Sequence, residues 1–281
     1  MLKTLAALPL SWFHALGVLL GRAVWVLSPR VRRLTRENLA GAGYHDPALL
    51  RRTVAEMGKS VMELIPVWFR PQDRAAELMA EVHAGQLINE ARAAGRGIIF
   101  VTPHLGCFEI TAQWYTHHVG PMTALFSPPK QGLVSWLVSG RGKQRLTLAD
   151  PSLRGIRSLF RALKRGEAVG ILPDQTPGRG EGEWAPFFGR PAYTMTLAQR
   201  LAESTGAPII LAYAERLPGG RGYRGFALPM PPREAGESAA RHLNRALEML
   251  IRRCPEQYLW SYNRYKVPAG VAPPAGGQEV G

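Results

Sequence analysis

Cysteine is scarce in this 281-residue chain, and acidic residues are few. The two cysteines, Cys107 and Cys254, exclude a disulfide-stabilised scaffold and any zinc module built on four cysteines. Lys and Arg number 35 against 21 Asp and Glu, which gives a formal net charge of +14. So large a basic excess indicates an anionic partner: nucleic acid, a membrane surface, an acidic protein or a phosphorylated substrate. The hydrophobic share of 46% excludes a wholly disordered protein.

An apolar segment without acidic residues covers residues 5–27, and its main polar interruptions are His14 and Arg22. About 20 mostly apolar residues are enough to span a membrane as a helix. Four arginines follow the segment, and the positive-inside rule therefore places the bulk of the chain in the cytoplasm. These arginines are Arg30, Arg32, Arg33 and Arg36. We predict a membrane anchor over residues 1–30, either spanning or lying in the membrane surface.

Two other interpretations of this segment stay open. A secretory signal peptide is disfavoured, because the sequence VWVLSPR offers no small-x-small cleavage site. A buried amphipathic helix of a soluble domain would have the same apolar composition.

The rest of the chain alternates between helical and strand-like patterns. Helices are predicted over 47–69, 86–94, 152–165, 195–204 and 238–253, and strands over 80–83, 98–102, 168–172 and 208–213. Three times a helix ends at a glycine (Gly95, Gly166 and Gly206) and an apolar strand follows. This repeat predicts an α/β sheet with helices on its faces. We place one domain at 31–267 and a Pro/Gly-rich disordered tail at 268–281.

A candidate site directly follows the buried strand at 98–102, in the segment ThrProHisLeuGlyCysPheGluIle (102–110). Sites of α/β folds lie at the carboxyl ends of strands. On one continuous helix His104 and Glu109 would diverge by about 140°. They can meet only if His104 lies on the turn before a helix and Glu109 one turn inside it. A carboxylate on one imidazole nitrogen would leave the other as a general base, beside free helix N–H groups for an oxyanion. From the residues alone, a core histidine and a surface glutamate remain the alternative.

Several segments together carry a resemblance to a known family. They are the hydrophobic N-terminus, ArgGluAsnLeu (36–39), HLGCFE (104–109), a basic segment around Arg141, LPDQTPGRGEGEWAPFFGRPAYTMTLAQRLAESTGAP (172–208) and PEQYLWSYNRYKVP (255–268). In this order they cover almost the whole chain. The chain resembles the lipid A biosynthesis lauroyl/myristoyl acyltransferases of Gram-negative bacteria, within the glycerolipid acyltransferase superfamily and its H-x4-D/E motif.

The resemblance implies a single glycerolipid-acyltransferase-like α/β domain with a mixed sheet flanked by helices. It implies transfer of a fatty acyl chain from acyl carrier protein to a hydroxyl of a lipid A precursor. No metal and no cofactor are expected beyond the acyl carrier protein thioester, which is a co-substrate. The expected location is the bacterial inner membrane, with the catalytic domain on the cytoplasmic side.

The resemblance also implies roles for individual residues. His104 would deprotonate the acceptor hydroxyl, and Glu109 would orient and stabilise the histidine. Arg141 would contact the phosphorylated lipid or the oxyanion, with nearby Arg145 as the other candidate for that position. Asp174 would help to shape the acceptor site.

Other functions remain alternatives at this point. The acceptor could be a lysophospholipid or another glycolipid or aminolipid, and a non-catalytic membrane-surface binder is the second class. Cys107 beside His104 could act as a nucleophile, and His104, Cys107, Glu109, His117 and His118 could hold zinc, although their spacing fits no standard site. The basic helix at 154–165 could bind nucleic acid, but we expect it to face anionic lipid or the acidic carrier protein instead.

Overall fold

The computed structural model describes residues 2–83, 85–127 and 145–274. In this part of the chain, seven strands form one sheet in the order β1-β9-β8-β2-β5-β3-β4, and two more form the separate hairpin β6-β7. The strands are β1 (Met79–His83), β2 (Ile98–Val101), β3 (Met122–Leu125), β4 (Leu146–Ala149), β5 (Ala168–Ile171), β6 (Gly182–Phe187), β7 (Arg190–Met195), β8 (Ile209–Arg216) and β9 (Tyr223–Pro229). Neighbouring strands of the large sheet are parallel except β8 and β9, which are antiparallel. The expected mixed sheet is therefore confirmed.

Helices surround this sheet. They are α1 (Leu2–Ala6), α2 (Leu10–Leu27), α3 (Pro29–Gly41), α4 (Pro47–Met62), α5 (Leu64–Phe69), α6 (Gln72–Ala76), α7 (Gly85–Ala93), α8 (Phe108–His118), α10 (Leu153–Lys164), α11 (Leu197–Thr205) and α12 (Ala239–Ile251), with short 3₁₀ turns at Pro218–Gly220 and Pro255–Gln257. The predicted helix over 47–69 is divided into α4 and α5, because Pro66 has no N–H group with which to continue the first helix. Ser152 caps α10, as its side chain accepts a hydrogen bond from the Gly155 backbone N–H at 3.2 Å.

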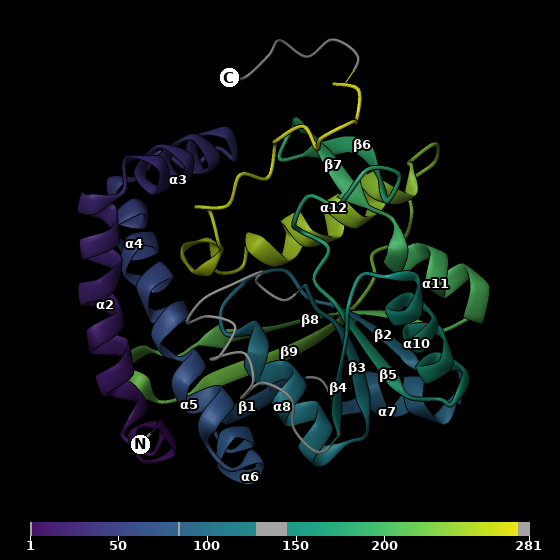
Figure 1. Cartoon of the computed structure of the whole chain (residues 1–281), viewed down its shortest axis with the longest axis horizontal. Coiled ribbons are helices and arrows are strands. Elements are labelled where there is room, and N and C mark those ends of the chain that lie inside the picture. The colour runs from purple at the N-terminus through teal and green to yellow at the C-terminus, as the bar shows by residue number, and fades with distance from the viewer. Residues whose placement is uncertain (1, 84, 128–144, 275–281) are drawn as a thin grey trace.

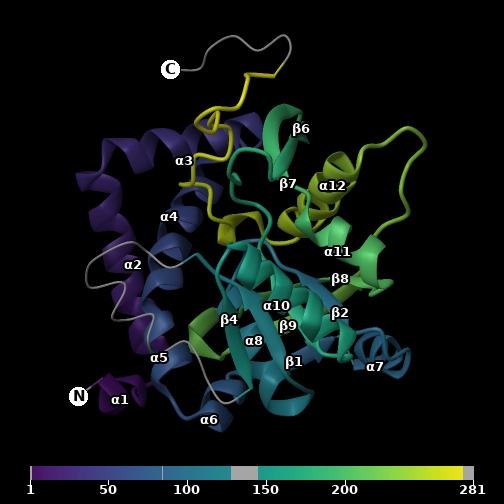
Figure 2. The same ribbon diagram turned by 45° about the vertical axis from the view of Figure 1, so that its right-hand side comes forward.

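The central strands are buried on both faces, and successive residues face opposite layers. On one face, Phe100 and Ile98 of β2 pack with α7 and α8. On the other face, Ile99 and Val101 pack with α10, α11 and α12. Figures 1 and 2 show these layers, with the helices α2 to α5 along the edge of the molecule beside β1 and β9.

Helix α2 is the one helix in the described residues that is long and apolar enough to cross a membrane. It packs along α4 (Figures 1 and 2), and 28% of its residues are buried. Glycines allow the two backbones to approach closely, because a Cβ atom on Gly58 of α4 would lie only 1.9 Å from the Gly17 carbonyl oxygen. Gly21 meets the same stretch of α4, since a Cβ atom there would lie 2.2 Å from the Val54 carbonyl oxygen. The inner face of α2 is therefore packed against α4 of its own domain.

The outer face of α2 is apolar and exposed. Trp12 and Leu19 are each 61% exposed, and Leu27 is 80% exposed. Leu16 and Val26 belong to the same exposed set. An apolar surface on a helix that already packs against its own domain indicates contact with something outside the protein.

A buried ionic cluster joins α2 and α4 to the sheet. Arg216 of β8 forms a bidentate salt bridge with the Glu63 carboxylate, with nitrogen–oxygen distances of 2.8 and 2.5 Å. Its guanidinium also donates to the Glu56 carboxylate at 2.6 Å. The Tyr223 hydroxyl donates to Glu63 at 3.0 Å, and His14 Nε2 of α2 lies 3.6 Å from the same carboxylate. Burial alone would raise the pKa of Glu63, but the Arg216 guanidinium lowers it to about 2. The charges are thus paired, which a buried site requires.

Candidate active site

His104 lies on the turn between strand β2 and helix α8, as the sequence predicted. Strand β2 ends at Val101, Pro103 follows, and α8 begins at Phe108. The imidazole is partly exposed, with 17% of the side chain accessible. It therefore stands at the carboxyl edge of the parallel part of the sheet, where it can be reached from outside.

The turn that carries His104 is fixed by backbone hydrogen bonds to distant segments. The Cys107 N–H donates to the Ala214 carbonyl of β8 at 2.9 Å, and the Gly106 N–H donates to the Gln257 carbonyl at 3.0 Å. Gly106 has a φ of +59°, and a Cβ atom there would lie 1.9 Å from the Ala214 oxygen. Only glycine fits this position, because it needs both a left-handed backbone and the missing side chain.

Asp174 holds the His104 ring. Its Oδ1 lies 2.8 Å from His104 Nδ1, and its Oδ2 accepts a hydrogen bond from the His104 backbone N–H at 2.9 Å. Asp174 is 2% exposed. Burial would raise the pKa of this carboxyl, but the charge and hydrogen bonds of His104, together with Arg264, keep it below its ordinary value. An ionised carboxylate only accepts hydrogen bonds, so Nδ1 carries the proton and the lone pair lies on Nε2.

Glu109 occupies a different position from the one expected. It is the second residue of α8, is 4% exposed, and its Oε2 accepts a hydrogen bond from Trp68 Nε1 of α5 at 3.0 Å. Glu109 was expected to orient and stabilise the histidine, but the carboxylate that contacts the His104 ring, at Nδ1, is that of Asp174. Asp174 in turn was expected to shape the acceptor site and instead supports the ring. Spacing along the chain favoured Glu109, whereas Asp174 comes from the end of a neighbouring parallel strand, β5.

The segments that carried the resemblance meet around this pair. The Asn38 side chain donates to the carbonyls of Trp260 and Tyr262 at 2.8 and 2.9 Å. The Tyr262 hydroxyl accepts a hydrogen bond from the Thr176 backbone N–H at 3.0 Å, two residues after Asp174. ArgGluAsnLeu, LPDQT and the C-terminal signature are thus joined by direct hydrogen bonds.

Arg264 is a buried cation in the same region. It is 2% exposed and donates to the Tyr193 carbonyl and the Thr194 hydroxyl, both at 2.7 Å. Burial lowers the pKa of its guanidinium, whereas the nearby Asp174 charge opposes that change. Arg264 and Asp174 therefore stabilise each other's charged forms.

Of the two arginines predicted to bind substrate, only Arg145 lies in the described part of the chain. Arg141 lies outside the described residues. Arg145 is exposed just before β4, and its carbonyl accepts a hydrogen bond from the first residue of β3, Met122, at 3.0 Å. Because β4 and β3 run parallel to β2 through β5, Arg145 lies at the amino edge of the sheet, opposite the edge that carries His104.

Cys107 and a metal site were the competing interpretations of this motif. Cys107 is 2% exposed, and burial, followed by the Glu63 charge, raises the pKa of its thiol well above the ordinary value. A buried neutral thiol is a poor nucleophile. Across residues 2–83, 85–127 and 145–274, no three His, Cys, Asp or Glu side chains gather into a group that could hold a metal ion.

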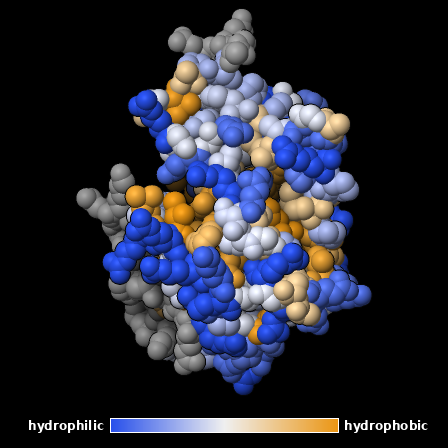
Figure 3. All heavy atoms as spheres, turned by 90° about the vertical axis from the view of Figure 1, so that its right-hand side faces the viewer, coloured by the Kyte–Doolittle hydropathy of each residue, from blue (hydrophilic) through white to orange (hydrophobic). Residues whose placement is uncertain are grey.

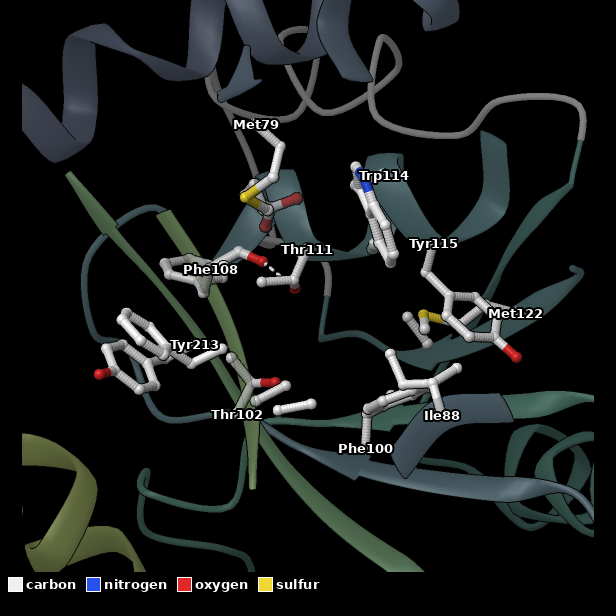
Figure 4. A pocket seen from close by; sticks show the side chains of 18 of the residues that line it. Met79, Ile88, Phe100, Thr102, Phe108, Thr111, Trp114, Tyr115, Met122 and Tyr213 are labelled. Atoms are coloured by element: carbon white, nitrogen blue, oxygen red, sulfur yellow. Dashed lines mark hydrogen bonds between the residues drawn. The ribbon is translucent and has the colours of Figure 1, made fainter. Parts of the chain in front are cut away.

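An apolar pocket lies beneath α8, against the face of the sheet that α7 also covers. It encloses about 720 Å³, including its open mouth. Apolar lining residues include Phe100, Trp114, Met122, Ala124 and Phe226, and the polar ones include Thr102, Thr111 and Glu109. Figure 4 shows Phe108 and Tyr213 at one end and Tyr115, Met122 and Ile88 at the other. The His104 ring packs edge-on against Phe108 at 4.8 Å between centroids, so the Phe108 end is the one near the site.

A partly exposed histidine backed by a buried carboxylate, next to an apolar pocket, is the kind of arrangement in which an active site is sought. The family model for bacterial lipid A biosynthesis acyltransferases matches residues 1–267. The chain belongs to this family, and it is an acyltransferase.

Individual relatives agree with this assignment. The chain is 29% identical over 275 residues to the lipid A biosynthesis lauroyltransferase of Escherichia coli, covering 94% of this chain and 89% of that protein. It is also 29% identical over 273 residues to the palmitoleoyltransferase of the same organism, covering 94% and 88%. Among solved structures, a 1-acyl-sn-glycerophosphate acyltransferase from Thermotoga maritima aligns with 90% of this chain and 95% of its own, at 15% identity and a TM-score of 0.35.

The pairing of Asp174 with His104 gives a direct test. Asp174→Asn should lower kcat by about 100-fold or more. The asparagine amide can donate to Nδ1, which places the ring proton on Nε2 and leaves that nitrogen without a lone pair. Steady-state acyl transfer measures this, with Asp73→Asn, an exposed carboxyl on α6, as the matched control. Wild-type kcat in a folded Asp174→Asn protein would contradict the pairing.

Proposed function

We propose that this enzyme transfers a fatty acyl chain from acyl carrier protein to a hydroxyl of a lipid A precursor. The observation that carries the proposal is the position of His104, held by Asp174 and placed beside the apolar pocket under α8. Family membership supports the reaction class, and the lipid A biosynthesis enzymes among its relatives support the lipid acceptor.

The proposed chemistry follows from the tautomer of His104. Nε2 takes the proton of the acceptor hydroxyl while the oxygen attacks the thioester carbonyl carbon. The carbon–sulfur bond then breaks, and the leaving thiolate takes the proton from the imidazolium. The negative oxygen of the intermediate would face the amino end of α8, which carries the positive end of the helix dipole. The buried Asp174 carboxylate stabilises the imidazolium that forms between these steps.

The pocket under α8 would hold the acyl chain. Its lining is mostly apolar, as a site for a hydrocarbon chain requires. Each buried methylene group contributes about 0.8 kcal/mol, so a long chain gains affinity with every carbon that fits. The residues at the end opposite Phe108, Met122 and Ile88, would therefore limit the preferred chain length.

Helix α10 would help the enzyme meet its acidic donor. Its cationic side chains Arg154, Arg157, Arg161 and Lys164 are exposed. The helix begins after β4 at the edge of the sheet that carries His104 and returns toward the opposite edge, so Arg154 is the cation nearest that edge. Figure 3 looks onto the side of the molecule where α10 and α11 lie, and it shows many hydrophilic residues with apolar ones in the hollows between them. A cationic surface near the site would speed encounter with acyl carrier protein.

The exposed apolar face of α2 would enter the cytoplasmic leaflet of the bacterial inner membrane. Because the inner face of α2 packs on α4 through Gly17, Gly21 and Gly58, we propose that α2 lies in the membrane surface and does not span it. Exposed Arg33 and Arg36 on α3 stand where anionic headgroups would be.

The central experiment mixes purified enzyme with acyl carrier protein thioesters and a lipid A precursor in mixed micelles. Mass spectrometry should show one added acyl ester per turnover, and His104→Ala should lower the rate by about 10²–10⁴-fold. The rate should fall as salt is raised, since the donor is steered by charge. Transfer at the wild-type rate by folded His104→Ala, or acylation of a lysophospholipid in preference to the lipid A precursor, would contradict the proposal.

The acyl pocket makes a separate prediction. Ala124→Leu should reduce use of the longest chains by roughly tenfold, because the added carbons fill space inside the pocket. Product masses from a mixture of acyl chain lengths measure this, and Ala93→Leu on the exposed side of α7 should leave the distribution unchanged. An unaltered distribution for Ala124→Leu would show that the chain binds elsewhere.

The membrane pose is tested with vesicles that contain anionic lipid. Leu16→Glu combined with Leu19→Glu should abolish co-sedimentation, because two charges would enter the apolar layer. Leu153→Glu is the matched control, as Leu153 is 76% exposed but lies on α10. Equal binding of the double variant and wild type would rule out this face of α2 as the contact.

A further inference from the structure

Gln175 contacts the catalytic nitrogen of His104. Its side-chain Nε2 lies 3.2 Å from His104 Nε2, and it directly follows Asp174 in the chain. The side chain is half-buried, so it shares the space that an incoming substrate would use. No sequence pattern distinguishes this glutamine from the rest of the segment 172–208.

The direction of this hydrogen bond follows from the protonation of the two ring nitrogens of His104. Asp174 fixes the proton on Nδ1, which leaves Nε2 as a hydrogen-bond acceptor. The Gln175 amide donates an N–H to that lone pair. An imidazole nitrogen offers a single lone pair in the plane of the ring, so two donors cannot use it at once.

We propose that Gln175 is a positioning residue that occupies the base lone pair of His104 until an acceptor hydroxyl displaces it. This inference rests on the proposed function, in which Nε2 takes the hydroxyl proton. Water would need the same lone pair, so the amide also keeps water from acting as the acceptor. Gln175 thereby favours transfer of the acyl chain over its hydrolysis.

The residues on either side of Gln175 are held by hydrogen bonds, so displacement from His104 Nε2 involves only the Gln175 side chain. Asp174 is held by the His104 ring and backbone. Thr176 is held on the other side, through its N–H to the Tyr262 hydroxyl at 3.0 Å and its hydroxyl to the Arg264 carbonyl at 3.2 Å. With both neighbours fixed, Gln175 can release Nε2 by rotating its side chain, and no backbone movement is required.

Gln175 would suppress hydrolysis of the acyl thioester by water. Water gives a proton to Nε2, and its oxygen attacks the thioester carbonyl carbon. The carbon–sulfur bond breaks, the thiolate takes the proton from the imidazolium, and a free fatty acid and a free carrier-protein thiol result. The same base and the same donor thus serve both reactions, and only the acceptor differs.

The first test reads the hydrogen bond without any substrate. Diethyl pyrocarbonate acylates the free lone pair of a neutral imidazole, and mass spectrometry of peptides gives the rate at each histidine. In Gln175→Leu the rate at His104 should rise about fivefold, the factor that corresponds to losing one ordinary neutral hydrogen bond. Exposed His45 is the internal standard, and Gln86→Leu on α7 is the matched control. Gln175→Met, also unable to donate, guards against misfolding of the first variant.

The second test measures how the acyl group is divided between the acylated lipid and free fatty acid. In Gln175→Leu the ratio of free fatty acid to acylated lipid should rise by a similar factor, about fivefold. Unchanged reactivity of His104 in folded Gln175→Leu and Gln175→Met, or an unchanged ratio, would overturn the inference.

The outcomes separate this inference from the proposed function. If wild type transfers acyl groups and His104→Ala does not, the proposed function holds whatever Gln175→Leu does. If wild type transfers nothing to the lipid, the proposed function fails, while the reactivity of His104 still reports whether Gln175 occupies its lone pair.

Discussion

The hydrogen bond between His104 Nδ1 and the buried Asp174 carboxylate is the interaction on which the chemistry of this site depends. It decides which nitrogen carries the proton, and therefore which nitrogen faces the substrate with a lone pair. A buried carboxylate is costly unless it is paired, and here His104 and Arg264 supply the compensating interactions. The pair is also a structural constraint, since it joins the segments that follow two neighbouring parallel strands, β2 and β5.

The rest of the fold holds this pair in place from several directions. Gly106 lets the turn after β2 pass close to β8, and Gln257 holds the same turn from the C-terminal side. Asn38 fastens α3 to the C-terminal signature, which in turn holds Thr176. Segments from both ends of the chain are thus needed to position a single imidazole. The extent of the family match, residues 1–267, agrees with a site that is assembled from the whole chain.

Much of this could be predicted from local pattern. Glycine-ended helices followed by apolar strands gave the α/β class, and Pro103 after a buried strand placed His104 on a turn. The partner of His104 could not be found by spacing, because Asp174 is 70 residues away and is brought close by strand pairing. Glu109 was the nearer carboxylate in sequence, yet it contacts Trp68. Short strands such as β3 and β4 carry too little periodicity to be recognised, and the pocket draws its lining from several elements that are distant in sequence.

The central claim is that His104 Nε2 meets the acyl group at the mouth of the pocket beneath α8. The most direct measurement is an experimental structure with a non-hydrolysable thioether analogue of the acyl donor and the lipid acceptor bound. The account predicts the alkyl chain between α8 and the sheet, ending toward Met122, with the acceptor hydroxyl about 2.6–3.2 Å from Nε2. A chain bound outside that pocket, or an acceptor hydroxyl beyond reach of His104, would contradict it.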